Sequence, residues 1–185
     1  MSKKIIILNG SPRPNGNTAA LIDEFTKGAE SAGNTVTRFN LKGMDIRPCI
    51  GCFKGGSDPA SPCVQKDDMN KIYPAYKEAD IVVFASPMYY WSWTGLIKTA
   101  FERLFAIEEL YQGERPQKGT ILLMPAGVEQ EAEDWKTVTD YYQALLNHLG
   151  WTDCGMVKAG GVMDIGDIKG KSSLKEAYAL GASIS

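Results

Sequence analysis

The fold-deciding stretch is residues 4–18, which read KIIILNGSPRPNGNT. Its first part, Lys4 to Asn9, is an apolar run without alternation, which is typical of a strand covered on both faces of a parallel sheet. The run stops at Gly10, and the loop that follows ends at Asn17 and Thr18, residue types that favour a helix start. The stretch therefore predicts a strand, a tight polar loop and a helix in close succession.

The rest of the chain continues this alternation. Further strands are expected at 35–41, 81–85, 119–124 and 151–158, and helices at 17–32, 68–78, 94–105, 134–149 and 173–180. Strands that alternate with helices imply an α/β fold, with a parallel sheet covered by helices on both sides. Five strands favour the flavodoxin-like doubly wound order 2-1-3-4-5 over the six-stranded dinucleotide fold. We expect one domain spanning residues 1–185.

Composition narrows the class of protein. The chain has 185 residues, 44% of them hydrophobic, which is enough for one core without disulfides or metals. A net charge of −2 argues against binding to nucleic acid or to an anionic membrane. We see neither a signal-peptide pattern nor an apolar run long enough for a membrane span. We therefore expect a cytoplasmic protein with reduced cysteines.

The loop from Gly10 to Thr18 has the composition of an anion site. It lies between a strand and a helix start, where backbone N–H groups and the helix dipole favour negative charge. Candidate phosphate ligands are the hydroxyls of Ser11 and Thr18, the amide of Asn17, which should also cap the helix, and the guanidinium of Arg13. A Walker A loop and a G-x-G-x-x-G fingerprint are both absent. The alternative is a polar loop with an ordinary helix cap.

A second loop, residues 86–93, reads SPMYYWSW and follows the third strand at the same sheet edge. Four aromatic side chains and a methionine could form a flat apolar wall for a ring-shaped ligand. We expect Trp93 and Phe101 in the core or at a subunit contact. Lys98 and Arg103, on the following helix, are expected to be solvated or paired.

Three segments together resemble the NAD(P)H-dependent FMN reductases, a family that includes iron–sulfur flavoproteins. They are residues 7–13 (ILNGSPR) with Gly16-Asn17-Thr18, residues 81–90 (IVVFASPMYY) and residues 95–98 (GLIK). The resemblance covers roughly residues 4–104, and only the order of elements beyond. It implies that FMN binds with its phosphate in the 10–18 loop. It places the flavin ring against Pro87, Met88, Tyr89 and Tyr90, with Trp91 nearby and Ala126 and Gly127 closing on the ring.

The resemblance also implies an activity. NAD(P)H would be the co-substrate, and hydride or electrons would pass by a ping-pong cycle to a quinone, flavin, nitro compound or similar small acceptor. No catalytic acid or base is assigned, because the flavin carries the chemistry. The alternative is a flavodoxin-type electron carrier without turnover of its own, against which the weak net charge and Arg13 argue. We expect a homodimer with residues 90–93 and 49–62 near the contact.

The cysteines raise a separate question. Cys49 and Cys52 have the spacing of a metal-ligand pair. Iron–sulfur flavoproteins carry four cysteines in this region, but the position three residues after Cys52 is Gly55, and only Cys63 lies beyond it. A zinc site completed by Asp58 and a redox-active pair are alternatives. We favour a packed loop without a cluster and assign no metal.

Overall fold

The computed structural model describes residues 2–112 and 115–185, and its centre is a parallel sheet of five strands. The strand order is β2-β1-β3-β4-β5, which confirms the flavodoxin-like prediction. The strands are β1 (Lys4–Asn9), β2 (Thr35–Asn40), β3 (Ile81–Ala85), β4 (Gly119–Pro125) and β5 (Thr152–Ala159).

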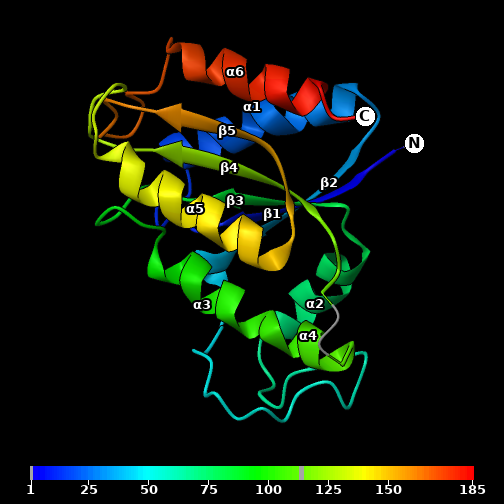
Figure 1. The fold of residues 1–185 in the computed structure, drawn as a ribbon. Coiled ribbons are helices and arrows are strands. Elements are labelled where there is room, and N and C mark those ends of the chain that lie inside the picture. Colours follow the sequence, from blue (N-terminus) through cyan, green and yellow to red (C-terminus); the bar gives the residue numbers. More distant parts are fainter. Residues whose placement is uncertain (1, 113–114) are drawn as a thin grey trace.

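Helices cover both faces of the sheet (Figure 1). On one face lie α1 (Asn17–Ser31) and α6 (Ser172–Ala182), and on the other α2 (Met69–Glu78), α3 (Gly95–Arg103), α4 (Phe105–Leu110) and α5 (Trp135–Leu149). Alternate residues of one strand feed the two cores: Ile5 and Ile7 pack with the α1 side, Ile6 and Leu8 with the other. Because both faces of the sheet are covered at its centre, β1 and β3 are buried, unbroken apolar runs from Ile5 to Leu8 and from Ile81 to Ala85, whereas the edge strands β2 and β5 include polar, partly exposed residues.

The two helices of the first layer touch backbone to backbone. A Cβ atom on Gly28 of α1 would lie 2.1 Å from the carbonyl oxygen of Tyr178, and one on Gly181 of α6 would lie 2.2 Å from that of Phe25. Only glycine leaves room for this approach. The helix that follows the 10–18 loop is thus fixed against α6.

The predicted helix at 94–105 differs from the structure at its C-terminal end. It matches α3, which ends at Arg103, whereas α4, from Phe105 to Leu110, was not predicted; the two helices meet at Leu104. Around the junction the hydrogen bonds are of the tighter i to i−3 kind, from Leu104 to Phe101 and from Ile107 to Leu104. Periodicity alone did not show this, because both helices bury residues on the same side of the sheet.

The prediction that Asn17 caps α1 is also wrong. The N-cap residue is Gly16, and the helix has no side-chain capping hydrogen bond. The Asn17 side chain instead bonds to the segment after β5, at Asp164 and Gly166.

Trp93 is confirmed as a core residue: it is buried and stacks on Phe84 with ring centroids 4.6 Å apart. Phe101 packs edge-on against Trp93 at 5.9 Å.

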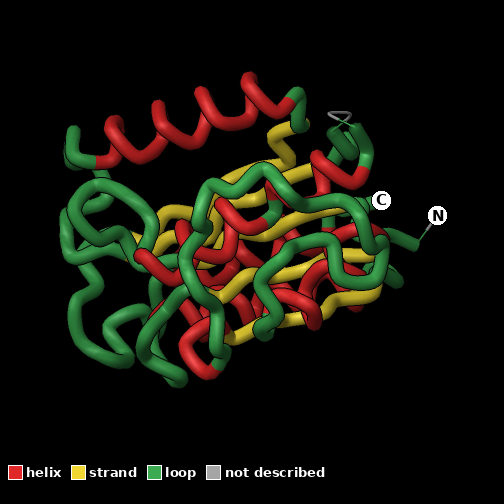
Figure 2. The backbone as a smooth tube through the Cα atoms, turned by 90° about the horizontal axis from the view of Figure 1, so that it is seen from below, coloured by secondary structure: helices red, strands yellow, loops and turns green. Residues whose placement is uncertain are grey.

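The cysteine loop, residues 44–68, carries three of the four cysteines. It packs against α3 and α4 on the lower side of the molecule (Figures 1 and 2). A buried ion pair anchors it. Arg103 contacts both oxygens of Asp67, at 2.6 and 3.2 Å, and the two side chains are 1% and 0% exposed. Arg103 also donates to the Arg47 carbonyl at 2.7 Å. Arg103 is therefore paired, while Lys98 pairs at the surface with Glu102.

Candidate functional site

The carboxyl ends of β1, β3, β4 and β5 meet at one edge, where backbone hydrogen bonds continue beyond the strands. The Gly10 amide donates to the Ala85 carbonyl at 2.8 Å, and the Ala126 amide donates to the Ala159 carbonyl at 2.9 Å. The four loops that follow these strands are therefore held in fixed positions relative to one another. In this fold a ligand binds at the strand-order switch beside β1 and β3.

The 10–18 loop presents the start of α1 to this edge. The first-turn N–H groups of Asn17 and Thr18 have no acceptor within the helix, and the N-cap residue supplies no side-chain acceptor for them. The positive end of the helix dipole lies at the same place. Gly10 lets the loop approach α3, because a Cβ there would lie 2.4 Å from Cγ1 of Ile97. Thr94 fixes the loop by donating to the Gly10 carbonyl at 2.9 Å.

Two of the predicted phosphate ligands reach the segment after β5. Arg13 donates to the Met163 carbonyl at 2.7 Å, and the Asn17 amide donates to the Asp164 carbonyl at 3.0 Å. Asn17 also accepts from the Gly166 amide at 3.1 Å. The segment after β5 thus forms a further wall of the site. Sequence reasoning missed this wall, although Gly160-Gly161 directly after the strand resembled the glycine that ends β1.

The aromatic loop contains a strained two-residue turn. Tyr89 and Ser92 exchange backbone hydrogen bonds of 3.0 and 3.1 Å, and between them Tyr90 and Trp91 both adopt positive φ, +49° and +58°. Such turns prefer Asn-Gly, so two large aromatic residues here cost about 1–3 kcal/mol each. The Trp91 indole N–H donates to Asp134 at 2.6 Å, while Tyr90 is 93% exposed. The turn projects two aromatic side chains beside the sheet edge.

These loops enclose a cavity of about 270 Å³. Nine of the eleven predicted site residues line it: Arg13, Asn17, Thr18, Pro87, Met88, Tyr89, Tyr90, Ala126 and Gly127. Pro125, Val162 and Met163, which were not predicted, complete the lining. An adjoining cavity of about 390 Å³ shares five of these residues and adds Trp91, Val128 and Asp134.

Ser11, the remaining predicted residue, lines neither cavity. It is buried, and its hydroxyl bridges the backbone of Arg13, accepting from the amide and donating to the carbonyl at 3.2 Å each. Its side chain shapes the loop in this structure.

The chemistry of the first cavity fits FMN. One end carries uncapped N–H groups, a hydroxyl and a guanidinium, which suit a phosphate. The other walls are an aromatic loop and the small residues Ala126 and Gly127, which leave room for a flat ring.

Comparison with known proteins decides the family. The sequence profile described as NADPH-dependent FMN reductase matches residues 3–157. The chain belongs to this family. An iron-sulfur flavoprotein of Archaeoglobus fulgidus is 32% identical over 98% of the chain and 78% of that protein. An iron-sulfur flavoprotein of Methanocaldococcus jannaschii is 32% identical, but the match spans only 54% of this chain and 51% of that protein.

Solved structures of two oxidoreductases share the fold. An NAD(P)H:quinone oxidoreductase from Methanothermobacter marburgensis superimposes with a TM-score of 0.78 at 18% identity, with all of both chains covered. An FMN-dependent NADH-azoreductase from Bacillus anthracis, solved in complex with FMN, gives a TM-score of 0.68 at 17% identity over 96% of this chain and 97% of that one.

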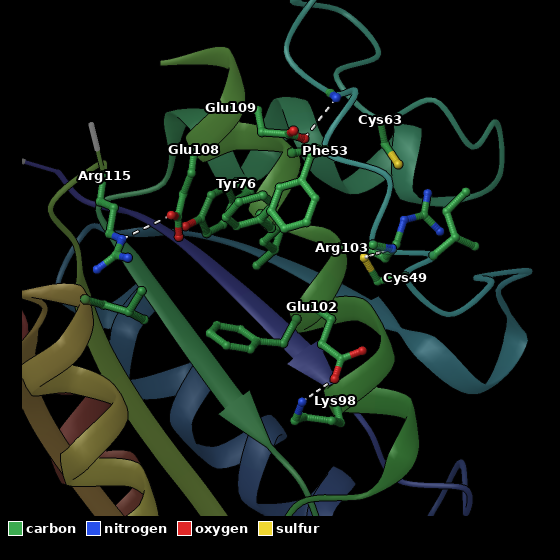
Figure 3. A pocket seen from close by; sticks show the side chains of 18 of the residues that line it. Cys49, Phe53, Cys63, Tyr76, Lys98, Glu102, Arg103, Glu108, Glu109 and Arg115 are labelled. Carbon is green, nitrogen blue, oxygen red and sulfur yellow. Dashed lines mark hydrogen bonds and ion pairs between the residues drawn. The ribbon is translucent and has the colours of Figure 1, made fainter. Parts of the chain in front are cut away.

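The cysteine loop covers a separate cavity of about 660 Å³ (Figure 3). Cys49 is exposed, and Cys52 and Cys63 are half-buried. Within residues 2–112 and 115–185, no three Cys, His, Asp or Glu side chains are close enough together to hold a metal ion. The thiols as they stand therefore do not fit a four-thiolate iron–sulfur cluster.

Proposed function

We propose that this chain binds FMN in the cavity between the loops after β1, β3, β4 and β5. In this proposal the enzyme transfers electrons from NAD(P)H to a small planar acceptor such as a quinone, a flavin or a nitro compound. The observation that carries the proposal is that one cavity is lined by nine of the residues expected to bind FMN, from the loops after β1, β3 and β4. The membership of the NADPH-dependent FMN reductase family supports the same reaction class.

The roles of the residues follow from their places. Thr18, Arg13 and the first turn of α1 hold the phosphate by hydrogen bonds and by the helix dipole. Binding of the phosphate by Arg13 requires its guanidinium to exchange or share its bond with the Met163 carbonyl. Ala126 and Gly127 leave space for the ring, and Tyr89 covers it from the side.

Bound FMN would supply the redox chemistry by taking a hydride from the nicotinamide and passing electrons to the acceptor. The adjoining cavity has the position needed for both molecules in turn, because it shares Met88, Tyr90 and Met163 with the first cavity. Its exposed wall, Tyr90, offers an aromatic face for stacking. One shared site visited alternately is suited to a ping-pong cycle, in which the oxidised nicotinamide leaves before the acceptor reacts.

The predicted homodimer and cytoplasmic location remain part of the proposal. Trp93 cannot lie in the contact, since it is buried in the core. The proposed contact surface therefore consists of Tyr90 and Trp91 with Ile50, which is 64% exposed. All four cysteines are free, as expected in a reducing compartment. In residues 2–112 and 115–185, no helix is both long and apolar enough to cross a membrane.

The test is a flavin titration followed by steady-state kinetics. We expect the purified protein to bind one FMN per chain with quenching of flavin fluorescence, and to oxidise NADPH or NADH when a quinone is added. Initial rates at several acceptor concentrations should give parallel double-reciprocal lines. Failure to bind FMN would overturn the proposal. FMN binding without turnover on quinone, nitro and flavin acceptors would instead favour an electron carrier.

A further inference from the structure

The residue that takes the place of the missing cysteine is a carboxylate on α4. The backbone amide of Gly55 donates to Oε2 of Glu109 at 2.9 Å (Figure 3). A Cβ atom on Gly55 would lie only 2.1 Å from that oxygen and 3.0 Å from the Glu109 Cδ atom. The same Cβ would lie 3.1 Å from the Pro62 carbonyl oxygen, so a cysteine at this position would have to displace the Glu109 carboxylate from the Gly55 amide.

The next residue packs equally closely. Gly56 has a φ of +79°, and a Cβ there would lie 2.5 Å from the carbonyl carbon of Glu109. Its amide donates to the Pro62 carbonyl at 2.8 Å, which closes the loop on itself. Gly55 and Gly56 thus allow the loop backbone to pack directly against the end of α4, with the Glu109 carboxylate between the loop and the helix.

The surrounding contacts hold this arrangement in place. Phe53, whose φ is +47°, packs its ring edge-on against Phe105 of α4, with centroids 5.8 Å apart. Farther along, Asp67 and Arg103 form the buried ion pair that fixes the end of the loop. The loop is therefore fastened at several points to α3 and α4.

We propose that Glu109 is a positioning residue that replaces a cluster ligand, so that this chain closes its cysteine loop with a carboxylate–amide bond and assembles no four-thiolate iron–sulfur cluster. This inference concerns the loop and is independent of the flavin chemistry proposed above. Whether the protein oxidises NAD(P)H therefore neither supports nor contradicts the role of Glu109.

The first test measures opening of the loop by trypsin. Lys54 is exposed, and the bond that trypsin would cleave after it contains the Gly55 amide that Glu109 holds. In Glu109→Ala the amide loses a charged acceptor, so we expect cleavage at this bond to be about tenfold faster than in the natural protein. Glu109→Gln keeps an oxygen acceptor and should give an intermediate rate. Fragments are identified by mass spectrometry.

Glu108→Gln is the matched control. Glu108 is the neighbouring residue on α4, lines the same cavity and pairs with Arg115 at 3.1 Å rather than with the loop. Its substitution should leave cleavage after Lys54 unchanged. Equal cleavage rates in Glu109→Ala and in the natural protein would refute the anchoring role.

The second test measures iron. After anaerobic reconstitution with ferrous iron and sulfide, the natural protein and Gly55→Cys should hold well below one iron per chain. The double variant Gly55→Cys/Glu109→Ala, which frees the space for the thiol, should take up several-fold more. A full cluster of iron and sulfide in the natural protein would overturn the proposal. Iron uptake that does not differ between the single and the double variant would overturn the claim that Glu109 occupies the ligand's place.

Discussion

The Asp67–Arg103 pair gives the sharpest prediction on stability. The two side chains are 0% and 1% exposed, and the guanidinium contacts both carboxylate oxygens as well as the Arg47 carbonyl. Replacing Asp67 by Ala leaves a buried, uncompensated charge, which costs about 3–5 kcal/mol of unfolding free energy. For a chain of this length that corresponds to a fall of about 6–20 °C in the thermal midpoint.

The assay is thermal and urea unfolding followed by circular dichroism. The control is Glu102→Ala on the same helix, which breaks the solvent-exposed pair with Lys98 and should change the midpoint little. The double variant Asp67→Leu/Arg103→Met removes both charges and should recover at least half of the loss. Equal stability of Asp67→Ala and Glu102→Ala would show that the buried pair contributes no more than an exposed one.

The same pair predicts a pH dependence. Burial by itself would raise the pKa of Asp67, but hydrogen bonds from Arg103 and from the Arg47 and Met69 amides hold it below its ordinary value. The stability that the carboxylate contributes is therefore complete above its unfolded-state pKa of about 4, and it is lost as the pH falls through the lower folded-state pKa. The stability difference between the natural protein and Asp67→Asn should narrow below about pH 4.

Two further predictions concern the flavin cavity. Arg13→Ala should weaken FMN binding about tenfold to a hundredfold in a fluorescence titration, because a charge-assisted bond to the phosphate is lost; an unchanged Kd would exclude Arg13 from the phosphate site. Tyr90→Asn suits the left-handed turn better and should leave the thermal midpoint unchanged or higher. With FMN saturating, it should raise the KM for a quinone about threefold to tenfold through loss of stacking, and an unchanged KM would remove Tyr90 from the acceptor site.

The sheet and most of the cavity were predictable because their signals are local. An unbroken apolar run such as Ile5 to Leu8 identifies a strand buried on both faces, and the parallel topology then brings the ends of β1 and β3 together. Once the order of strands was known, the loops after them had to share an edge. The positions of Thr18 and Met88 on one cavity follow from this alone.

The remaining features depend on contacts between residues distant in sequence. Nothing near Arg13 indicates that its guanidinium reaches the Met163 carbonyl, because that contact depends on how the segment after β5 returns over α1. Likewise, Gly55 in the sequence shows that a cysteine is absent, but it does not predict which group takes the place of the thiol. The carboxylate that fills the space belongs to Glu109 on α4, a short helix beyond the end of the one predicted at 94–105.

The glycine contact between α1 and α6 has a consequence for how the site is made. The ribosome delivers α1 and its loop early, but α6, which buries the outer side of α1, emerges only after all five strands. Until α6 has been made, the side of α1 that includes Gly28 is exposed to solvent. The start of α1, which we assign to the phosphate, then belongs to a helix that is packed on one side only. We therefore expect a nascent chain to retain FMN only after α6 has been synthesised and has packed against α1.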